Sequence, residues 1–270
     1  MKPTAPIDLS ARAPETALAA SFAWAARATY GFAAVVFGVT AFIWHDYGSW
    51  PQAQVLGKTS AAHVVLAAIA LAHVIGGFAL LLNRTVRAGA ILLGVVYLFF
   101  ALLALPRVFT TPLVYDAWNN IFEQLSVFCG ALLIYAAAPA HEAQWKCLRA
   151  GILLFGICVL SFTLEQVFYL SATASLVPKW IPPAQMFWAV ATTVAFALAG
   201  IAILSGWWAI LAARLFAVMI LLFSLSIWLP KIVNAPQRHF NWTEAAESLA
   251  IAATAWLVAD SLSSVRRRVL

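Results

Sequence analysis

Two glutamates, 124 residues apart, are the residues whose position in this sequence points most directly to chemistry. Glu123 and Glu247 each lie within an otherwise apolar stretch that is long enough to cross a membrane. A charged side chain near the centre of a bilayer costs about 2.5–3.5 kcal/mol on insertion scales, and less near the edge. Each glutamate therefore needs a partner of opposite charge, a water-filled cavity or a proton.

A recurring pattern surrounds each of these glutamates. Leu-Pro-Arg or Leu-Pro-Lys comes first, a tryptophan follows, and the glutamate comes five residues after the tryptophan. We expect the Arg or Lys side chain to face the glutamate and the tryptophan to cover the glutamate. At about 1.5 Å per residue, each glutamate would lie roughly 5–7 Å below the outer interface. The alternatives are a buried ion pair that only fixes helix register, or a glutamate that reaches the interface and has no role. The candidate ligand or proton site residues are Arg107, Trp118, Glu123, Glu165, Lys231, Trp242 and Glu247.

Histidines offer a weaker candidate for a metal site. His45, Asp46 and His63 are expected near the same outer surface as Glu123. His63 and His73 lie ten residues apart on one predicted helix, which separates them by about 15 Å of rise and places them on different faces. Those two histidines therefore cannot share one metal ion. A bis-histidine haem is not supported either, because the second half offers no histidine inside a predicted span.

Membrane-spanning helices must position these residues. Of the 270 residues, 64% are hydrophobic and only 10% are charged, whereas a soluble domain carries about a quarter charged residues. A spanning helix needs about 20 apolar residues. The sequence therefore predicts an all-α polytopic membrane protein with spans at about 24–45, 61–82, 88–105, 119–137, 150–170, 184–205, 209–229 and 245–262.

The basic residues indicate how the spans are oriented. With eight spans, 11 Lys and Arg residues fall on the side that carries both termini and 5 on the other side. Cytoplasmic segments are the ones that carry the excess of Lys and Arg, so we expect both termini to be cytoplasmic. The net charge of +6 is spread between apolar runs. That spread favours an anionic lipid bilayer as the partner and argues against a nucleic acid.

An internal repeat relates the two halves of the chain. A shift of 124 residues places residues 105–108 (Leu-Pro-Arg-Val) on 229–232 (Leu-Pro-Lys-Ile), and gives eight identities between residues 105 and 133. Two units of four spans each insert with the same orientation, so we predict two parallel four-helix bundles side by side. The expected segments are a cytoplasmic N-terminal segment 1–23, a first repeat 24–137, a linker 138–148, a second repeat 149–262 and a basic tail 263–270.

The repeated unit resembles the DoxX-like family of bacterial integral membrane proteins. The resemblance rests on residues 176–182 (Leu-Val-Pro-Lys-Trp-Ile-Pro), Gly200, residues 229–231, residues 242–244 and Glu247, and it covers about 149–262 well and the first half more weakly. It implies a four-helix bundle and a location in the bacterial inner membrane. It also implies redox or sulfur-linked partners, including quinone-reactive assemblies. The tandem duplication departs from the single-unit form of that family.

Three functions are compatible with these features. The leading hypothesis is a binding or accessory subunit of a quinone-linked membrane redox system, with a membrane redox partner and with quinone as the candidate cofactor, stacked on Trp118 or Trp242. The second is a proton-coupled small-molecule carrier, because parallel repeats and paired membrane carboxylates suit that class. The third is a metal-dependent membrane oxidoreductase. The sequence contains no P-loop, no dinucleotide fingerprint and no H-E-x-x-H or G-x-S-x-G motif, so it leaves open whether the protein is an enzyme.

Overall fold

The computed structural model describes residues 12–44, 59–137 and 142–269, with side chains described within 23–44, 59–137 and 144–264. Across these ranges the chain is helical and contains no strand. The elements are α1 (Arg12–Trp44), α2 (Ser60–Ala79), α3 (Val86–Thr110), α4 (Tyr115–Ala137), α5 (Glu142–Phe168), α6 (Leu170–Leu176), α7 (Gln185–Ser205), α8 (Ala209–Phe223), η2 (Ser224–Trp228), α9 (Leu229–Asn234) and α10 (His239–Val269).

Eight helical stretches within the described ranges are long and apolar enough to cross a membrane. The all-α polytopic prediction is confirmed, and α8, η2 and α9 together form one of these stretches, Ala209–Asn234. Large apolar side chains cover the outside of the helices: Val95, Leu102 and Ile201 are each more than half exposed. Such a surface is unfavourable in water and favourable against lipid. The protein is therefore an integral membrane protein whose outer surface is solvated by a bilayer.

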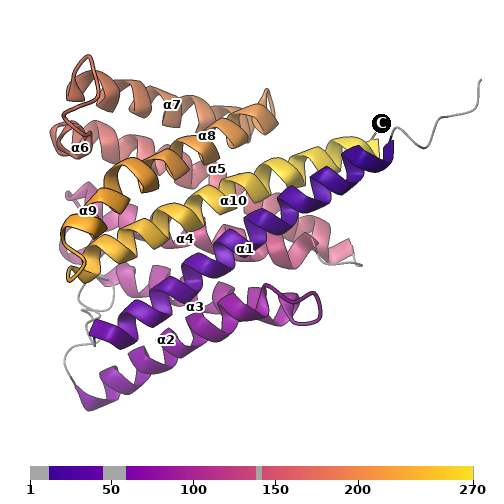
Figure 1. The fold of residues 1–270 in the computed structure, drawn as a ribbon, viewed down its shortest axis with the longest axis horizontal. Coiled ribbons are helices and arrows are strands. Elements are labelled where there is room, and N and C mark those ends of the chain that lie inside the picture. Colours follow the sequence, from indigo (N-terminus) through magenta and orange to yellow (C-terminus); the bar gives the residue numbers. More distant parts are fainter. Residues whose placement is uncertain (1–11, 45–58, 138–141, 270) are drawn as a thin grey trace, which may run out of the picture.

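The two helices that carry Glu123 and Glu247 lie at the centre of the bundle. α4 packs directly against α10; α4 also packs against α3 and α5, and α10 also packs against α1 and α8. The first span of each half packs on the last span of the other half: α1 lies along α10, and α5 lies along α4. Figure 1 shows α1 and α10 running side by side, with α2 and α3 on one side and α7 and α8 on the other. The spans thus form one continuous bundle, which differs from the predicted pair of separate four-helix bundles.

Small residues allow the backbones to approach closely at two of these interfaces. Between α1 and α2, a Cβ at Gly77 would overlap the carbonyl oxygen of Gly31. Between α4 and α10, a Cβ at Gly130 would overlap Thr254 Oγ1 and the ring of Tyr30. Close packing of small residues is a main source of helix association in lipid, where burial of apolar surface from water does not contribute.

The seventh span contains a π-helical segment, η2, directly before Pro230. Proline has no backbone N–H and its ring collides with the carbonyl one turn earlier, so a regular α-helix cannot continue through it undisturbed. Here the helical turn contains one extra residue: the N–H of Leu229 donates to the carbonyl of Ser224, five residues earlier instead of four. Pro106, the matching proline of the first half, lies within the α-helix α3 without such a segment. The two halves therefore differ in shape at this point.

Two boundaries differ from the predictions in a way that matters for the glutamates. α4 begins at Tyr115 and the last span begins at His239, four and six residues earlier than predicted. Polar residues at these starts, such as Asp116 and Asn241, lower the hydropathy without ending the helix. The start of α1 and the end of α10 lie at the same end of the bundle (Figure 1), as an even number of spans requires.

Candidate functional site

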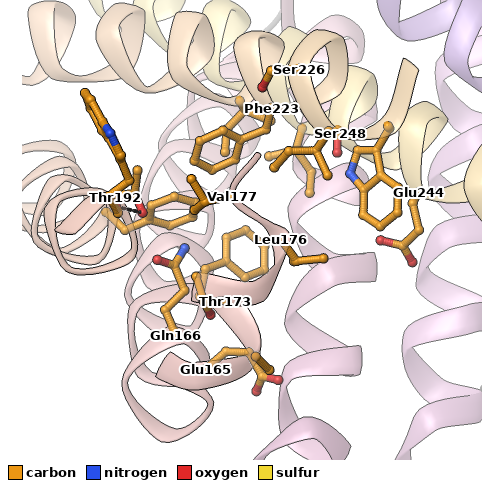
Figure 2. Close-up of a pocket in the computed structure, with 18 of the residues that line it drawn as sticks. Glu165, Gln166, Thr173, Leu176, Val177, Thr192, Phe223, Ser226, Glu244 and Ser248 are labelled. Carbon is orange, nitrogen blue, oxygen red and sulfur yellow. Dashed lines mark hydrogen bonds between the residues drawn. The ribbon is translucent and has the colours of Figure 1, made fainter. Parts of the chain in front are cut away.

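A cavity of about 400 Å³ lies among α4, α5, α6, α7, α8, η2 and α10. Four carboxyl groups line it: Glu123 on α4, Glu165 on α5, and Glu244 and Glu247 on α10. Figure 2 shows Glu165 and Glu244 entering the cavity from different sides, with Phe223 and Ser226 on a third side. α4 belongs to the first half of the sequence and every other lining element to the second, so the cavity is built by both halves.

Glu123 and Glu247 lie further along their helices than the sequence predicted. Each is eight residues from the first residue of its span, which corresponds to roughly 12 Å at about 1.5 Å per residue. The predicted depth was half of that, because the starts of these two spans were placed too late. Both glutamates are half-buried.

A chain of hydrogen bonds leads from Tyr115, the first residue of α4, to Glu123. Tyr115 Oη and Ser161 Oγ are 3.0 Å apart, and Ser161 Oγ donates to Asn119 Oδ1 at 3.2 Å. Asn119 Nδ2 then donates to Glu123 Oε1 at 3.1 Å. Asn119 is almost fully buried. The chain fixes the amide of Asn119 and aims one donor at the Glu123 carboxyl.

Two carboxyl oxygens at the cavity are left without a partner. Glu165 Oε2 and Glu247 Oε1 are buried, and neither has a hydrogen-bond partner among the described residues. Buried polar atoms in proteins are nearly always hydrogen-bonded, so an unsatisfied one points to strain, a proton, water or a ligand. Among the described residues that line the cavity, there is no Lys, Arg or His.

Aromatic rings form the opposite wall of the cavity. Phe196 is stacked with Phe223 at a centroid distance of 6.4 Å and meets Phe162 edge-on at 6.4 Å. Trp188 and Trp228 also line the cavity. The site therefore combines acidic groups on one side with a broad apolar and aromatic surface on the other, as small-molecule sites in proteins often do.

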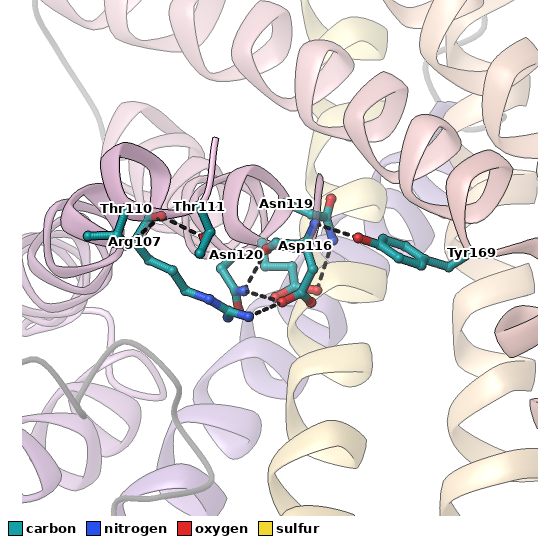
Figure 3. A network of polar contacts seen from close by, with 8 residues as sticks. Arg107, Thr110, Thr111, Asp116, Asn119, Asn120 and Tyr169 are labelled. Carbon is teal, nitrogen blue, oxygen red and sulfur yellow. Dashed lines mark hydrogen bonds and ion pairs between the residues drawn. The ribbon is translucent and has the colours of Figure 1, made fainter. Parts of the chain in front are cut away.

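Arg107 pairs with an aspartate that the sequence reasoning did not single out. Its Nη2 lies 2.6 Å from Asp116 Oδ2, and Asn120 Nδ2 donates to the backbone carbonyl of Asp116 at 2.6 Å (Figure 3). The predicted contact of Arg107 with Glu123 is replaced by this pair. The reason is local: α3 ends at Thr110 and α4 begins at Tyr115, so the short turn brings Arg107 to the first residues of α4.

Lys231 is also held outside the cavity. Its Nζ lies 4.2 Å from the centroid of the Trp228 ring, within the range of a cation–π contact. It is close enough to Glu244 for their opposite charges to attract. Lys231 therefore interacts with Glu244, whereas the sequence predicted that it would face Glu247.

The two candidate tryptophans hold turns and do not cover the glutamates. Trp118 Nε1 donates to the carbonyl of Pro112 at 3.0 Å, and Trp242 Nε1 donates to the carbonyl of Pro236 at 2.9 Å. Neither tryptophan lines the cavity. Backbone bonds of these turns also recur after 124 residues: Thr111 N to Arg107 O at 2.9 Å matches Ala235 N to Lys231 O at 3.0 Å.

The candidate metal ligands are only partly within the described ranges. His45 and Asp46 lie outside them. His63 is exposed, and its Nδ1 is 2.9 Å from the carbonyl of Thr59, at the start of α2. Within the described ranges, no group of three or more His, Cys, Asp and Glu side chains is arranged to hold a metal ion.

The first half does not repeat the polar lining of the cavity. Residues 124 positions before Trp188, Thr192, Ser226 and Trp228 are Val64, Ala68, Leu102 and Ala104. In the first half, a buried His73 packs among rings instead, at 5.3 Å from Tyr97 and 5.8 Å from Phe37. The halves have therefore kept the turn and the central glutamate but have different surroundings.

Sequence reasoning missed three features of the site. Glu244 was not a candidate, although it lies three residues before Glu247 and so on the same face of a helix. The aromatic wall of Phe162, Phe196 and Phe223 could not be told from ordinary apolar lining, because all spans are rich in such residues. The short helix α6, whose residues Ala172 and Thr173 line the cavity, gave no sequence signal of its own.

Fold and cavity together define the class of this chain: an integral membrane protein with an acid-lined cavity between its spanning helices. Comparison with protein-family models, with curated proteins and with solved structures gave no significant match. The resemblance to the DoxX-like family therefore stays a prediction.

Proposed function

We propose that this protein is a proton-coupled membrane carrier that binds a small lipid-soluble molecule in the cavity. The observation that carries the proposal is the set of four glutamates around a cavity of about 400 Å³ within the spanning bundle. Ligand sites for small organic molecules are typically about 300–1,000 Å³. Ionisable groups inside a membrane are costly, and where they persist they commonly serve as proton relays or ligand sites.

The physical argument for coupling is competition for the carboxyl groups. Four carboxylates in a largely apolar cavity cannot all stay ionised without compensation, because their charges are poorly solvated and no base lies among the described lining residues. Protons are one form of compensation and a bound ligand is another. If protons and the ligand exclude each other from the site, ligand binding is linked to proton exchange. This linkage is the requirement for a proton-driven carrier.

The repeat and the topology support the same class. The matching turns and hydrogen bonds after 124 residues support a tandem duplication of a four-span unit with parallel orientation, and parallel repeats are common in carriers. The excess of Lys and Arg on the terminal side supports cytoplasmic termini. A bacterial inner membrane follows from the DoxX-like resemblance and is part of the proposal.

The aromatic wall favours one second candidate. Phe162, Phe196, Phe223 and Trp228 would also suit the flat ring of a quinone, with a protonated glutamate as hydrogen-bond donor to its carbonyl oxygen. That alternative is the quinone-linked accessory subunit, with a membrane redox partner. Native mass spectrometry of the protein released from lipid nanodiscs tests it, since a quinone that co-purifies would be seen as a mass adduct.

Charge displacement on a solid-supported membrane tests the carrier proposal without knowledge of the ligand. Proteoliposomes that carry the protein should give a transient current when the external pH is stepped, because protons enter or leave the cavity glutamates. The quadruple variant E123Q/E165Q/E244Q/E247Q should lose this current, and Asp260→Asn, which changes an acid 13 residues beyond Glu247 on α10 and outside the cavity lining, should keep it. Equal currents from the quadruple variant and the original chain would sink the proposal.

A further inference from the structure

We infer that the ligand of this cavity is a hydrophobic organic cation, such as a quaternary ammonium or phosphonium ion or a protonated amine with an aromatic body. The inference rests on the proposed function and names its substrate class. Three independent features of the cavity lead to it: its charge, its two unpartnered oxygens and its aromatic wall.

The charge of the lining is one-sided. Glu123, Glu165, Glu244 and Glu247 bring four carboxyl groups from three helices, and no base lies among the described lining residues. The two bases nearby are already engaged. Arg107 is 2.6 Å from Asp116, and Lys231 is 4.2 Å from the ring centroid of Trp228. An anionic ligand would meet repulsion in this cavity, whereas a cation would meet uncompensated negative charge.

The unpartnered oxygens supply the second, independent feature. Glu165 Oε2 and Glu247 Oε1 are buried acceptors that no described group satisfies, whereas the amide of the neighbouring Asn119 is bonded to Ser161 and Glu123. An unmade hydrogen bond of a buried group costs about 1–3 kcal/mol. A cation placed beside these oxygens offsets the repulsion between the carboxylates, and a protonated amine can in addition donate the missing hydrogen bonds.

The aromatic wall excludes a small inorganic cation and suits an organic one. A hard metal ion requires about six oxygen ligands or retained water, and the described residues offer no group of three metal-binding side chains arranged around one point. By contrast, Phe162, Phe196 and Phe223 form a continuous ring surface. Trp228 already attracts the Lys231 ammonium. Aromatic faces are the usual recognition surface for quaternary ammonium groups.

Proton competition follows from the groups that face these carboxyls. Glu247 meets Glu123 from α4, Tyr97 from α3 and Glu244 on its own helix. Glu165 interacts electrostatically with Arg107 and Asp116 at the turn between α3 and α4, and with Glu123 and Tyr115 on α4. Acids outnumber bases around both groups, so protons neutralise the empty cavity and a cation must displace them. Cation binding is then accompanied by proton release and weakens as the solution is acidified.

Two ions of equal shape and opposite charge give the sharpest test. The full chain in lipid nanodiscs is titrated with tetraphenylphosphonium and, separately, with tetraphenylborate, and binding is followed by isothermal titration calorimetry and by tryptophan fluorescence. We expect saturable binding of the cation only, release of protons on binding, and affinity that falls about tenfold or more from alkaline to mildly acidic solution.

Variants locate that binding in the cavity. The double variant E165Q/E247Q should lose about tenfold or more in affinity for tetraphenylphosphonium, while Asp260→Asn, on α10 but outside the cavity lining, should bind like the original chain. The pH dependence of tetraphenylphosphonium binding is measured on the original chain. It therefore tests the inference even if a variant fails to fold. Equal binding of both ions, cation binding that ignores acid, or full affinity in a folded E165Q/E247Q variant would each overturn the inference.

The outcomes separate the inference from the proposed function. If pH steps displace charge but tetraphenylphosphonium does not bind, the cation inference is wrong and the carrier proposal stands. If the pH-step current of the original chain equals that of the quadruple variant, the carrier proposal is wrong, whatever binds. Saturable binding of a neutral ubiquinone in place of the cation would favour the quinone-linked candidate.

Discussion

Gly130 on α4 and Thr254 on α10 are in direct contact at the centre of the bundle, with no room between them for a further methyl group. Tyr30 from α1 closes the same point, and its Oη donates to the carbonyl of Val127 at 2.6 Å. Three helices from both halves of the sequence therefore meet at one glycine. Gly130 and Thr254 lie on the same two helices that carry Glu123 and Glu247, so this contact sets the spacing of those helices.

Gly130→Ala should destabilise the protein by about 1–3 kcal/mol, because the added methyl group forces α4 and α10 apart in a close-packed interior. Gly94→Ala on α3 is the matched control, since its nearest heavy atom would be Ala131 Cβ at an ordinary 3.6 Å. There the substitution should be neutral or stabilising by up to about 1 kcal/mol, because glycine disfavours a helix. Thermal unfolding in detergent measures both, and equal effects would contradict this account of the interface.

Arg107 and Asp116 should show a coupling energy, and Arg107 and Glu123 should show none. The pair at 2.6 Å has side chains 39% and 46% exposed, and partly exposed ion pairs contribute about 0.2–1 kcal/mol. Double-mutant cycles with alanine at both positions measure each coupling from unfolding free energies. Additive losses for Arg107 with Asp116, or a strong coupling of Arg107 with Glu123, would restore the pairing predicted from the sequence.

Glu247→Met should stabilise the folded protein by about 1–2 kcal/mol while it abolishes cation binding. The carboxyl has a buried oxygen without a partner among the described residues, and replacing such a group by an apolar side chain of similar size removes an uncompensated cost. Binding sites commonly contain residues that lower the stability of the folded protein but are needed for function. If this variant instead loses about 3–5 kcal/mol, Glu247 belongs to a buried ion pair that fixes helix register.

Labelling of cysteines should report the orientation of the chain. Cys147 is half-buried near the start of α5, whereas Cys129 and Cys158 are buried in the bundle. If the terminal side is cytoplasmic, a membrane-impermeant maleimide should label Cys147 in inside-out vesicles and not in intact cells. Cys147→Ser should remove the labelling, and Cys129 and Cys158 should react only after unfolding. Labelling of Cys147 in intact cells would reverse the proposed topology.

The sequence predicts the spans well and the site only in part, for physical reasons. Span number follows from composition, because the hydrocarbon thickness of a bilayer imposes a length that any apolar helix must meet. The starts of α4 and of the last span were placed too late because residues such as Asp116 and Asn241 are polar yet helical. Glu123 and Glu247 stood out because a carboxyl in an apolar stretch has a large cost.

The partners of these glutamates could not be read from the chain. Arg107 has two acids within reach along the sequence, and only the geometry of the turn from α3 to α4 selects Asp116. In the packing across the halves, α5 lies on α4 and α1 lies on α10. The contacts between α1 and α10 join residues that are more than 100 positions apart in the sequence. Helix periodicity carries no information on which of eight apolar helices become neighbours.

The crossed packing of the first spans has a consequence for the origin of the site. If the two halves descend from one ancestral four-span protein, that ancestor would have formed the same arrangement as a symmetric dimer. Each subunit would then have contributed one helix to the cavity of the other. In the present chain, α4 of the first half lines a cavity whose other lining elements belong to the second half, so neither half alone would enclose it. At the corresponding positions of the first half, Val64, Ala68 and Leu102 are exposed and apolar, which suits contact with lipid and not the lining of a second cavity.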